Sequence, residues 1–327
     1  MKLLLGYLSR NQFVAALVII ALTWFFVSIR EILVVLFISF ILMTALIPIA
    51  NFLKKKGISH SISVMITYLA FIACFLLLIL PLAPFFIHQI GLLTNNFPQL
   101  FESATKALGI KIDYSNITSS LSNFFQAVGG NIISISGKIF GGFLSFLTVI
   151  VVSFYLLLYH DRFEKLILSL SPREKREEIL NVFRNIEEKM GNWMRGQLAL
   201  SFFIGVISWI FLTLIGVPYA LPLAFFAGFL EILPTIGPII ASVPAIIVAL
   251  TISPTLAIAV AIGYIVIQAI ENNLLVPKIM QAAVGLNPVV IIIAILVGGN
   301  LLGVWGALLS IPFLTILTII FRALSDD

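Results

Sequence analysis

The stretch GQLALSFFIGVISWIFLTLIGVPYALPLAFFAGFLEILPTIGPIIASVPAIIVAL, residues 196–250, decides the fold of this chain. It opens a longer run, residues 196–321, that contains only three formal charges: Glu231, Glu271 and Lys278. A run of this length can cross the ~30 Å hydrocarbon core of a bilayer several times as helix. A charged side chain near the bilayer centre costs about 2.5–3.5 kcal/mol or more, so such residues usually face an ion or substrate path. Glu231 and Glu271 are therefore candidate functional residues.

The composition of the whole chain is that of a membrane protein. Hydrophobic residues make up 61% and charged residues 10%, and the mean hydropathy is +1.17. Soluble domains lie far from these values, and the pattern lacks the alternation of a membrane β-barrel. The sequence therefore predicts an all-α polytopic membrane protein, with about six full spans plus two re-entrant helical hairpins, or eight spans. The six expected spans are residues 13–29, 32–53, 62–87, 139–159, 198–215 and 255–276.

Apolar and charged residues divide the chain into five segments. We expect N-terminal transmembrane helices over 1–87, an external amphipathic segment over 88–138, and a transmembrane helix over 139–160. A charged cytoplasmic helix over 161–195 and a transmembrane transport core over 196–327 follow. The external segment has apolar residues at helical spacing, which indicates a helix that lies on the membrane or packs on a neighbouring subunit. A substrate-gating lid is the alternative.

The distribution of basic residues predicts the orientation. Ser171, Pro172 and Glu174 have the spacing of a helix start, with the serine as N-cap of the charged helix. The basic residues of this helix, together with Lys54–Lys56, mark the cytoplasmic side. Both chain termini are then expected in the cytoplasm.

Two apolar runs in the C-terminal half are too long for one crossing and too short for two. Each is interrupted near its middle, which favours a re-entrant hairpin; one long, tilted and broken helix is the alternative in each case. Residues 219–250 are interrupted by Pro234, Gly237 and Pro238, and residues 288–321 by Gly298, Gly299, Gly303 and Gly306.

A weak internal repeat supports the hairpins. GFLEILPTIGPIIASVP (228–244) and GGNLLGVWGALLSIP (298–312) both begin with glycine and close with proline, Pro244 and Pro312. If the first hairpin opens outward and the second inward, the two halves have the inverted topology of many secondary transporters. Lys278 and Arg322 would then be cytoplasmic, and residues near Ser253 external.

Polar residues around Glu271 share one face of the expected span. Gln268, Glu271 and Asn272 occupy helical positions i, i+3 and i+4. A carboxylate flanked by amides can hold a proton or a cation while the amides bind a hydroxylated solute. Interhelical hydrogen bonding is the structural alternative. Pro277 is expected to end this span.

Glu231 lies three residues before Pro234, close to the expected tip of the first hairpin. A proline leaves a backbone carbonyl without its helical donor, so carboxylate and carbonyl together could bind a cation or a proton. Glu231 could instead accept hydrogen bonds from the free amides of the hairpin tip. Asn300 is the corresponding polar residue of the second hairpin.

Enzyme motifs are missing from the chain. It has no P-loop, zinc-protease or nucleophile-elbow string. The only cysteine, Cys74, lies in an apolar run, and His60, His88 and His160 are isolated in the sequence. We therefore expect no enzymatic activity, no cofactor, no bound metal and no nucleic-acid partner.

Three ordered motifs resemble a known family. EILPTIGPIIASVP (231–244), ENNLLVPKIM (271–280) and VGLNPVV followed by GGNLLGVWGALLSIP are similar to segments of the autoinducer-2 exporter family, also called PerM-like permeases. The resemblance covers nearly the whole chain in layout. One departure is visible, because the family often has histidine before the proline where this chain has Asn287 and Pro288.

The resemblance implies a secondary transporter in the inner membrane of a prokaryote. It would export a small polar solute such as autoinducer-2, with H⁺ or Na⁺ as the coupling ion. A sodium/proton antiporter is the alternative within the same class. A membrane scaffold or assembly protein that holds partners through the charged helix is a third hypothesis. We also expect a homo-oligomer, formed through helical faces in the bilayer.

Overall fold

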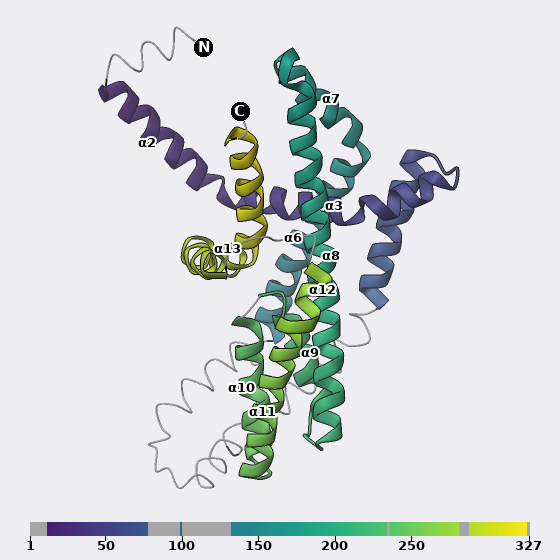
Figure 1. Ribbon diagram of the computed structural model, residues 1–327, viewed down its shortest axis with the longest axis vertical. Coiled ribbons are helices and arrows are strands. Elements are labelled where there is room, and N and C mark those ends of the chain that lie inside the picture. The colour runs from purple at the N-terminus through teal and green to yellow at the C-terminus, as the bar shows by residue number, and fades with distance from the viewer. Residues whose placement is uncertain (1–11, 78–98, 100–131, 234–235, 281–287, 326–327) are drawn as a thin grey trace.

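The computed structural model describes residues 12–77, 99, 132–233, 236–280 and 288–325. These residues form helices joined by short turns and contain no strand (Figure 1). Five helices are long and apolar enough to cross a membrane, or six if the bent pair Leu144–Leu158 and His160–Leu170 counts as one span. The described part of the chain is therefore an all-α polytopic membrane protein, as predicted.

The N-terminal part is a bundle of α3, α6 and the helix His60–Leu77. α2 (Gln12–Ser28) leads into α3 (Arg30–Lys55), and α6 covers Ile132–Leu158. Their core contains Leu46, Val64 and Ile150, and the Tyr68 hydroxyl is hydrogen bonded to Ser153. The predicted external segment, 88–138, lies almost entirely outside the described residues. Its last seven residues belong to α6, which begins earlier than expected.

The charged segment is two helices rather than one. α7 (His160–Leu170) and α8 (Arg176–Leu214) are separated by a turn that includes the short helix Arg173–Lys175. The predicted N-cap role of Ser171 is wrong. Its hydroxyl donates to the Ile167 carbonyl, 2.6 Å away, at the end of α7. The extended backbone at Ser171 and Pro172 ends one helix instead of opening the next, because a residue before proline is disfavoured in the helical region.

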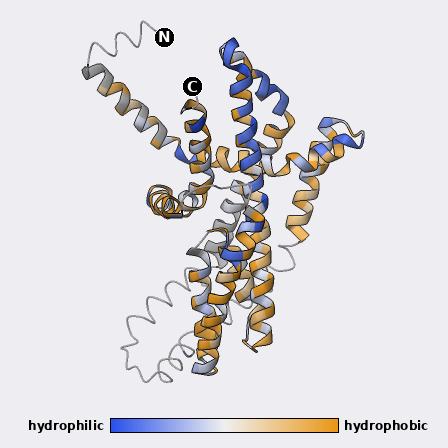
Figure 2. Ribbon diagram, viewed as in Figure 1, coloured by the Kyte–Doolittle hydropathy of each residue, from blue (hydrophilic) through white to orange (hydrophobic). Residues whose placement is uncertain are grey.

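α8 is the longest uninterrupted helix and joins the charged and apolar parts of the molecule. Its 39 residues reach about 58 Å at 1.5 Å per residue. The hydrophilic end of α8 lies beside α7, and its apolar end packs on α9 and contacts α11 (Figure 2). One helix therefore carries both a polar, charged region and part of the apolar core.

α3 crosses α8 in close contact (Figure 1). Gly191 of α8 lies against the Thr44 backbone of α3, where an added Cβ would meet the Thr44 carbonyl. Pro48 has no N–H to donate to that carbonyl. The guanidinium of Arg195 replaces the missing donor, since its Nη1 lies 3.3 Å from the Thr44 carbonyl oxygen and 3.0 Å from that of Ala45.

The core bundle consists of α8, α9 (Ala220–Leu230), α10 (Ile236–Leu250) and α11 (Pro254–Ile270). Small residues let the helices approach closely. Gly228 of α9 lies on Gly205 of α8, and a Cβ at Gly228 would stand 3.0 Å from the Gly205 Cα. Ala241, Ala245 and other small or aliphatic side chains fill the space between α9, α10 and α11. Such close contacts are typical of membrane helices, where packing rather than water exclusion holds the bundle together.

Both over-long apolar runs are broken in the structure. The first run divides into α9 and α10, and Gly237 in the first turn of α10 lies against the Leu230 carbonyl at the end of α9. Pro238 is buried in the first turn of α10, while Pro234 lies outside the described residues. The two helices pack on each other and have only 11 and 15 residues, too few for a full crossing.

The second run turns back on itself within α13 (Pro288–Ser325). Gly303 has φ 61° and ψ −143°, a backbone conformation that glycine adopts readily. Residues 288–302 and 304–325 then pack as two arms, with Gly298 against Gly306. The Ser310 hydroxyl reaches the Ala294 carbonyl of the other arm at 2.8 Å. Pro312 is fully buried in the second arm.

Candidate functional site

The two core glutamates are brought together in the structure. Glu231 is the first residue after α9, and Glu271 is the first residue after α11. They are 1% and 4% exposed, and their carboxyl groups are within hydrogen-bonding reach of each other. Forty residues of sequence separate them, so their contact is a property of the tertiary structure.

Close packing of α8 and α9 places Glu231. Glu231 follows the Gly228–Gly205 contact by three residues, so its side of α9 faces α8. There Gln197 of α8 donates its Nε2 hydrogen to the backbone carbonyl of Glu231, 2.6 Å away. Gln197, 3% exposed, was not among the predicted site residues. An amide in an otherwise apolar span is the sequence signal that could have indicated it.

Glu271 begins a widened helical turn. Residues Glu271–Leu275 form a π-helical turn, followed by α12 (Val276–Met280). π turns of this kind are rare and occur frequently at functional sites. Gln268 donates its Nε2 hydrogen to Glu271 Oε2 at 3.0 Å, so these two side chains lie on the same side of the helix.

Pro277 does not end this helix, contrary to the prediction. The helix continues through it to Met280, and the π turn directly precedes it. Proline lacks an N–H and its ring clashes with the carbonyl four residues earlier. The wider turn accommodates both effects without breaking the helix.

Two of the predicted polar residues, Asn272 and Asn300, are exposed rather than buried with the carboxyl pair. Asn272 is exposed, because the turn that buries Glu271 points the next residue outward. The neighbouring Asn273 donates to the Ala269 carbonyl at 2.8 Å. Asn300 is exposed on α13. The site that the structure assembles therefore consists of Glu231, Glu271, Gln268 and Gln197.

The charges of this site are incompletely balanced by protein groups. Glu231 Oε2 is buried and has no hydrogen-bond donor, and no ion pair in the described part of the chain involves either glutamate. Two ionised carboxylates in contact repel each other strongly in a buried place. A proton between them, or a cation bound to both, removes this repulsion. The pair is therefore chemically suited to hold one monovalent positive charge.

These features define a class of protein: a polytopic helical membrane protein with a pair of facing carboxyl groups buried among broken helices, as in secondary transporters. Residues 13–326 match the model of the AI-2E family transporters. The chain belongs to this family.

Two curated relatives illustrate the match. "Putative transport protein YrrI" of Bacillus subtilis is 28% identical over 90% of this chain and 87% of its own length. "Putative permease PerM" of Escherichia coli is 27% identical over 61% of this chain and 58% of its own length. The family and these relatives make the protein a membrane transporter.

Proposed function

We propose that this transporter exports a small polar solute such as autoinducer-2 and couples export to an ion through the Glu231–Glu271 pair. The observation that carries the proposal is the buried carboxyl pair with one unpartnered oxygen. A bound proton or cation would neutralise the pair in one state, and its release would leave two repelling charges. That change gives two states of different stability, which coupling to a gradient requires.

Nearby amides support a role in orienting the pair. Gln268 holds one oxygen of Glu271, and Gln197 holds the backbone of Glu231. These contacts come from α11 and α8, so loading or unloading the pair would act on both helices. The break after α9 begins at Glu231 and the π turn after α11 begins at Glu271, and irregular backbone of this kind can change hydrogen-bond partners.

Sodium/proton antiport is the second candidate function. Its specific support is the set of carboxyl oxygens that the pair offers, with which no cationic side chain of the described residues forms an ion pair. Oxygen ligands suit hard cations. In this case the pair would carry Na⁺ and H⁺ alternately, with no organic solute.

Flux through the purified protein in sealed vesicles tests both candidates. We expect autoinducer-2 efflux to accelerate when a pH gradient is imposed and to stop when an ionophore collapses it. Na⁺-dependent proton movement without any solute would instead favour antiport. The absence of flux for both probes under every gradient would contradict the proposal.

The inverted arrangement of the two hairpins makes a separate prediction. We expect positions 278 and 322 on the cytoplasmic side, with both termini, and position 253 outside. Single cysteines at these positions in a Cys74→Ala background should react with a membrane-impermeant maleimide only from the stated side. Labelling of position 278 from outside in intact cells would contradict the inverted arrangement.

A further inference from the structure

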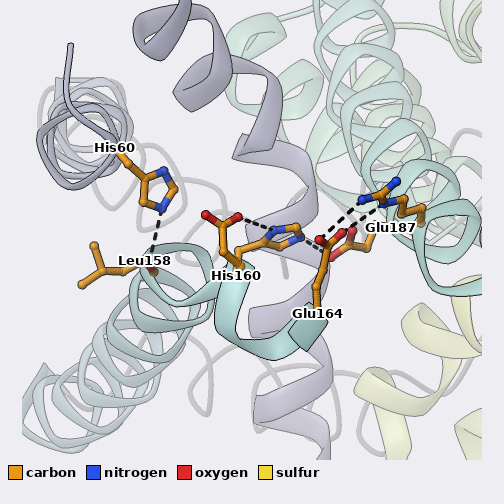
Figure 3. A network of polar contacts seen from close by, with 7 residues as sticks. His60, Leu158, His160, Glu164 and Glu187 are labelled. Atoms are coloured by element: carbon orange, nitrogen blue, oxygen red, sulfur yellow. Dashed lines mark hydrogen bonds and ion pairs between the residues drawn. The ribbon is translucent and has the colours of Figure 1, made fainter. Parts of the chain in front are cut away.

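A second cluster of titratable side chains lies far from the carboxyl pair, at the charged end of α8. His160 and Glu164 come from α7, and Glu187 comes from α8 (Figure 3). One ligand atom of each residue lies within 4.8 Å of the others. His160 Nε2 is 2.7 Å from Glu187 Oε1. These residues were not singled out from the sequence, because 27 positions separate His160 from Glu187.

The three side chains are those of a metal site. His160 and Glu164 are four residues apart on one helix, a spacing that turns both toward the same ligand. An imidazole nitrogen with two carboxylate oxygens suits Zn²⁺, Mn²⁺ or Co²⁺ rather than Ca²⁺ or Mg²⁺. Asp161 lies 3.9 Å from His160 Nδ1, on the side of the ring away from the cluster. Metal-bound histidines commonly direct their second nitrogen to such an outer carboxylate.

The local charge favours a cation. Asp161, Glu164 and Glu187 surround the imidazole, so carboxylate groups dominate the charge around it. Arg184 pairs with Glu164 at 3.0 Å, but its side chain is 58% exposed and can turn into solvent. The Glu187 side chain is only 8% exposed and pairs with His160, so a bound cation would take over this pairing in a partly buried place.

We propose that His160, Glu164 and Glu187 form a binding site for a divalent transition-metal ion such as Zn²⁺. The ion would join α7 to α8 across the turn at residues 171–175. It would also hold the 68° bend that precedes His160 in place, since α7, which follows the bend, would then be tied to α8. The site shares no residue with the carboxyl pair, whose members Glu231 and Glu271 follow α9 and α11.

Cobalt binding to the full-length protein in detergent tests this proposal. We expect one Co²⁺ to bind per chain and to give visible d–d absorption bands. Titration with Zn²⁺ in a calorimeter should show that Zn²⁺ displaces the bound Co²⁺. His160→Ala should lower the affinity by at least about 100-fold, since even the loss of a group that only supports a metal ligand typically costs about 10–100-fold. His60→Ala is the matched control and should bind normally, because His60 Nε2 contacts only the Leu158 carbonyl, at 3.3 Å (Figure 3). Glu231→Gln/Glu271→Gln should also bind normally.

Arg184→Gln separates a metal site from a network of ion pairs. The substitution removes the guanidinium that competes with the metal ion for Glu164. If the cluster is a metal site, the variant should bind Co²⁺ more tightly than the native chain does. Glu164→Gln should weaken binding and serves as a second ligand variant if His160→Ala does not fold. Absence of Co²⁺ binding to the native chain would overturn the proposal, even if Arg184→Gln bound it. Equal losses in the His60 and His160 variants would overturn it too.

Discussion

Replacing Glu271 by glutamine is expected to abolish gradient-driven net flux. Glutamine keeps the size of the side chain and its capacity to contact Gln268, but it cannot carry a negative charge or release a proton. Glu231 would then face a neutral amide, and the pair could no longer alternate between a loaded and an unloaded state. We expect flux at the level of protein-free vesicles, with a normal elution profile in detergent because the packing is unchanged.

Three further variants make this test specific. Glu231→Gln should also abolish coupling, because the two carboxyl groups are in contact. Asn272→Ala is the matched control: it is adjacent in sequence but exposed, so at least about half of the native flux should remain. If the double variant Glu231→Gln/Glu271→Gln keeps full coupled flux, the carboxyl pair is structural and the proposed mechanism is wrong.

Alanine at Gly298 is expected to destabilise the second hairpin, while alanine at Gly299 is not. A Cβ at Gly298 would collide with the Gly306 carbonyl and the Ser310 hydroxyl of the facing arm. Overpacking of this kind typically costs about 1–3 kcal/mol, and here the obstacle is backbone, which cannot move aside alone. A Cβ at Gly299 would lie 3.7 Å from the Ala307 Cβ, an ordinary contact.

The pair of variants is matched because both glycines lie in the same arm of α13 and gain the same helix propensity on replacement, about 0.5–1 kcal/mol. Thermal unfolding in detergent should therefore show a lower midpoint for Gly298→Ala and an unchanged or slightly higher one for Gly299→Ala. Equal midpoints for the two variants would contradict the close contact of the two arms.

Much of the architecture follows from local features of the sequence. Apolar runs of about 20 residues predicted the helices, and glycine and proline in the two over-long runs predicted where those runs break. Gly303 is the example in which one residue decides the turn, since its positive φ strains any other side chain. Glu231 and Glu271 could be recognised as candidate functional residues, because an ionisable side chain in an apolar membrane segment is energetically costly.

Local signals also led to errors. Ser171 has the sequence of an N-cap, but the extended backbone before Pro172 ends a helix there. Pro277 has the sequence signal of a helix end, but the wider π turn before it accommodates a residue without an N–H, and the helix continues. Asn272 was expected on the helix face of Gln268 and Glu271, and the structure places it exposed at the π turn. In each case, the arrangement of neighbouring turns outweighed the preference of a single residue.

The sequence by itself determined the membrane class, most of the helices and the two acidic residues, because hydropathy and charge act on each segment independently. Only the tertiary structure decided that Glu231 faces Glu271, that Gln197 holds the Glu231 carbonyl, and that His160 meets Glu187. These contacts join residues that are 27 to 40 positions apart. They depend on how closely two helices approach each other. A close approach needs a small residue on both helices, such as Gly205 on α8 and Gly228 on α9. The periodicity of one helix does not show which helix it packs against.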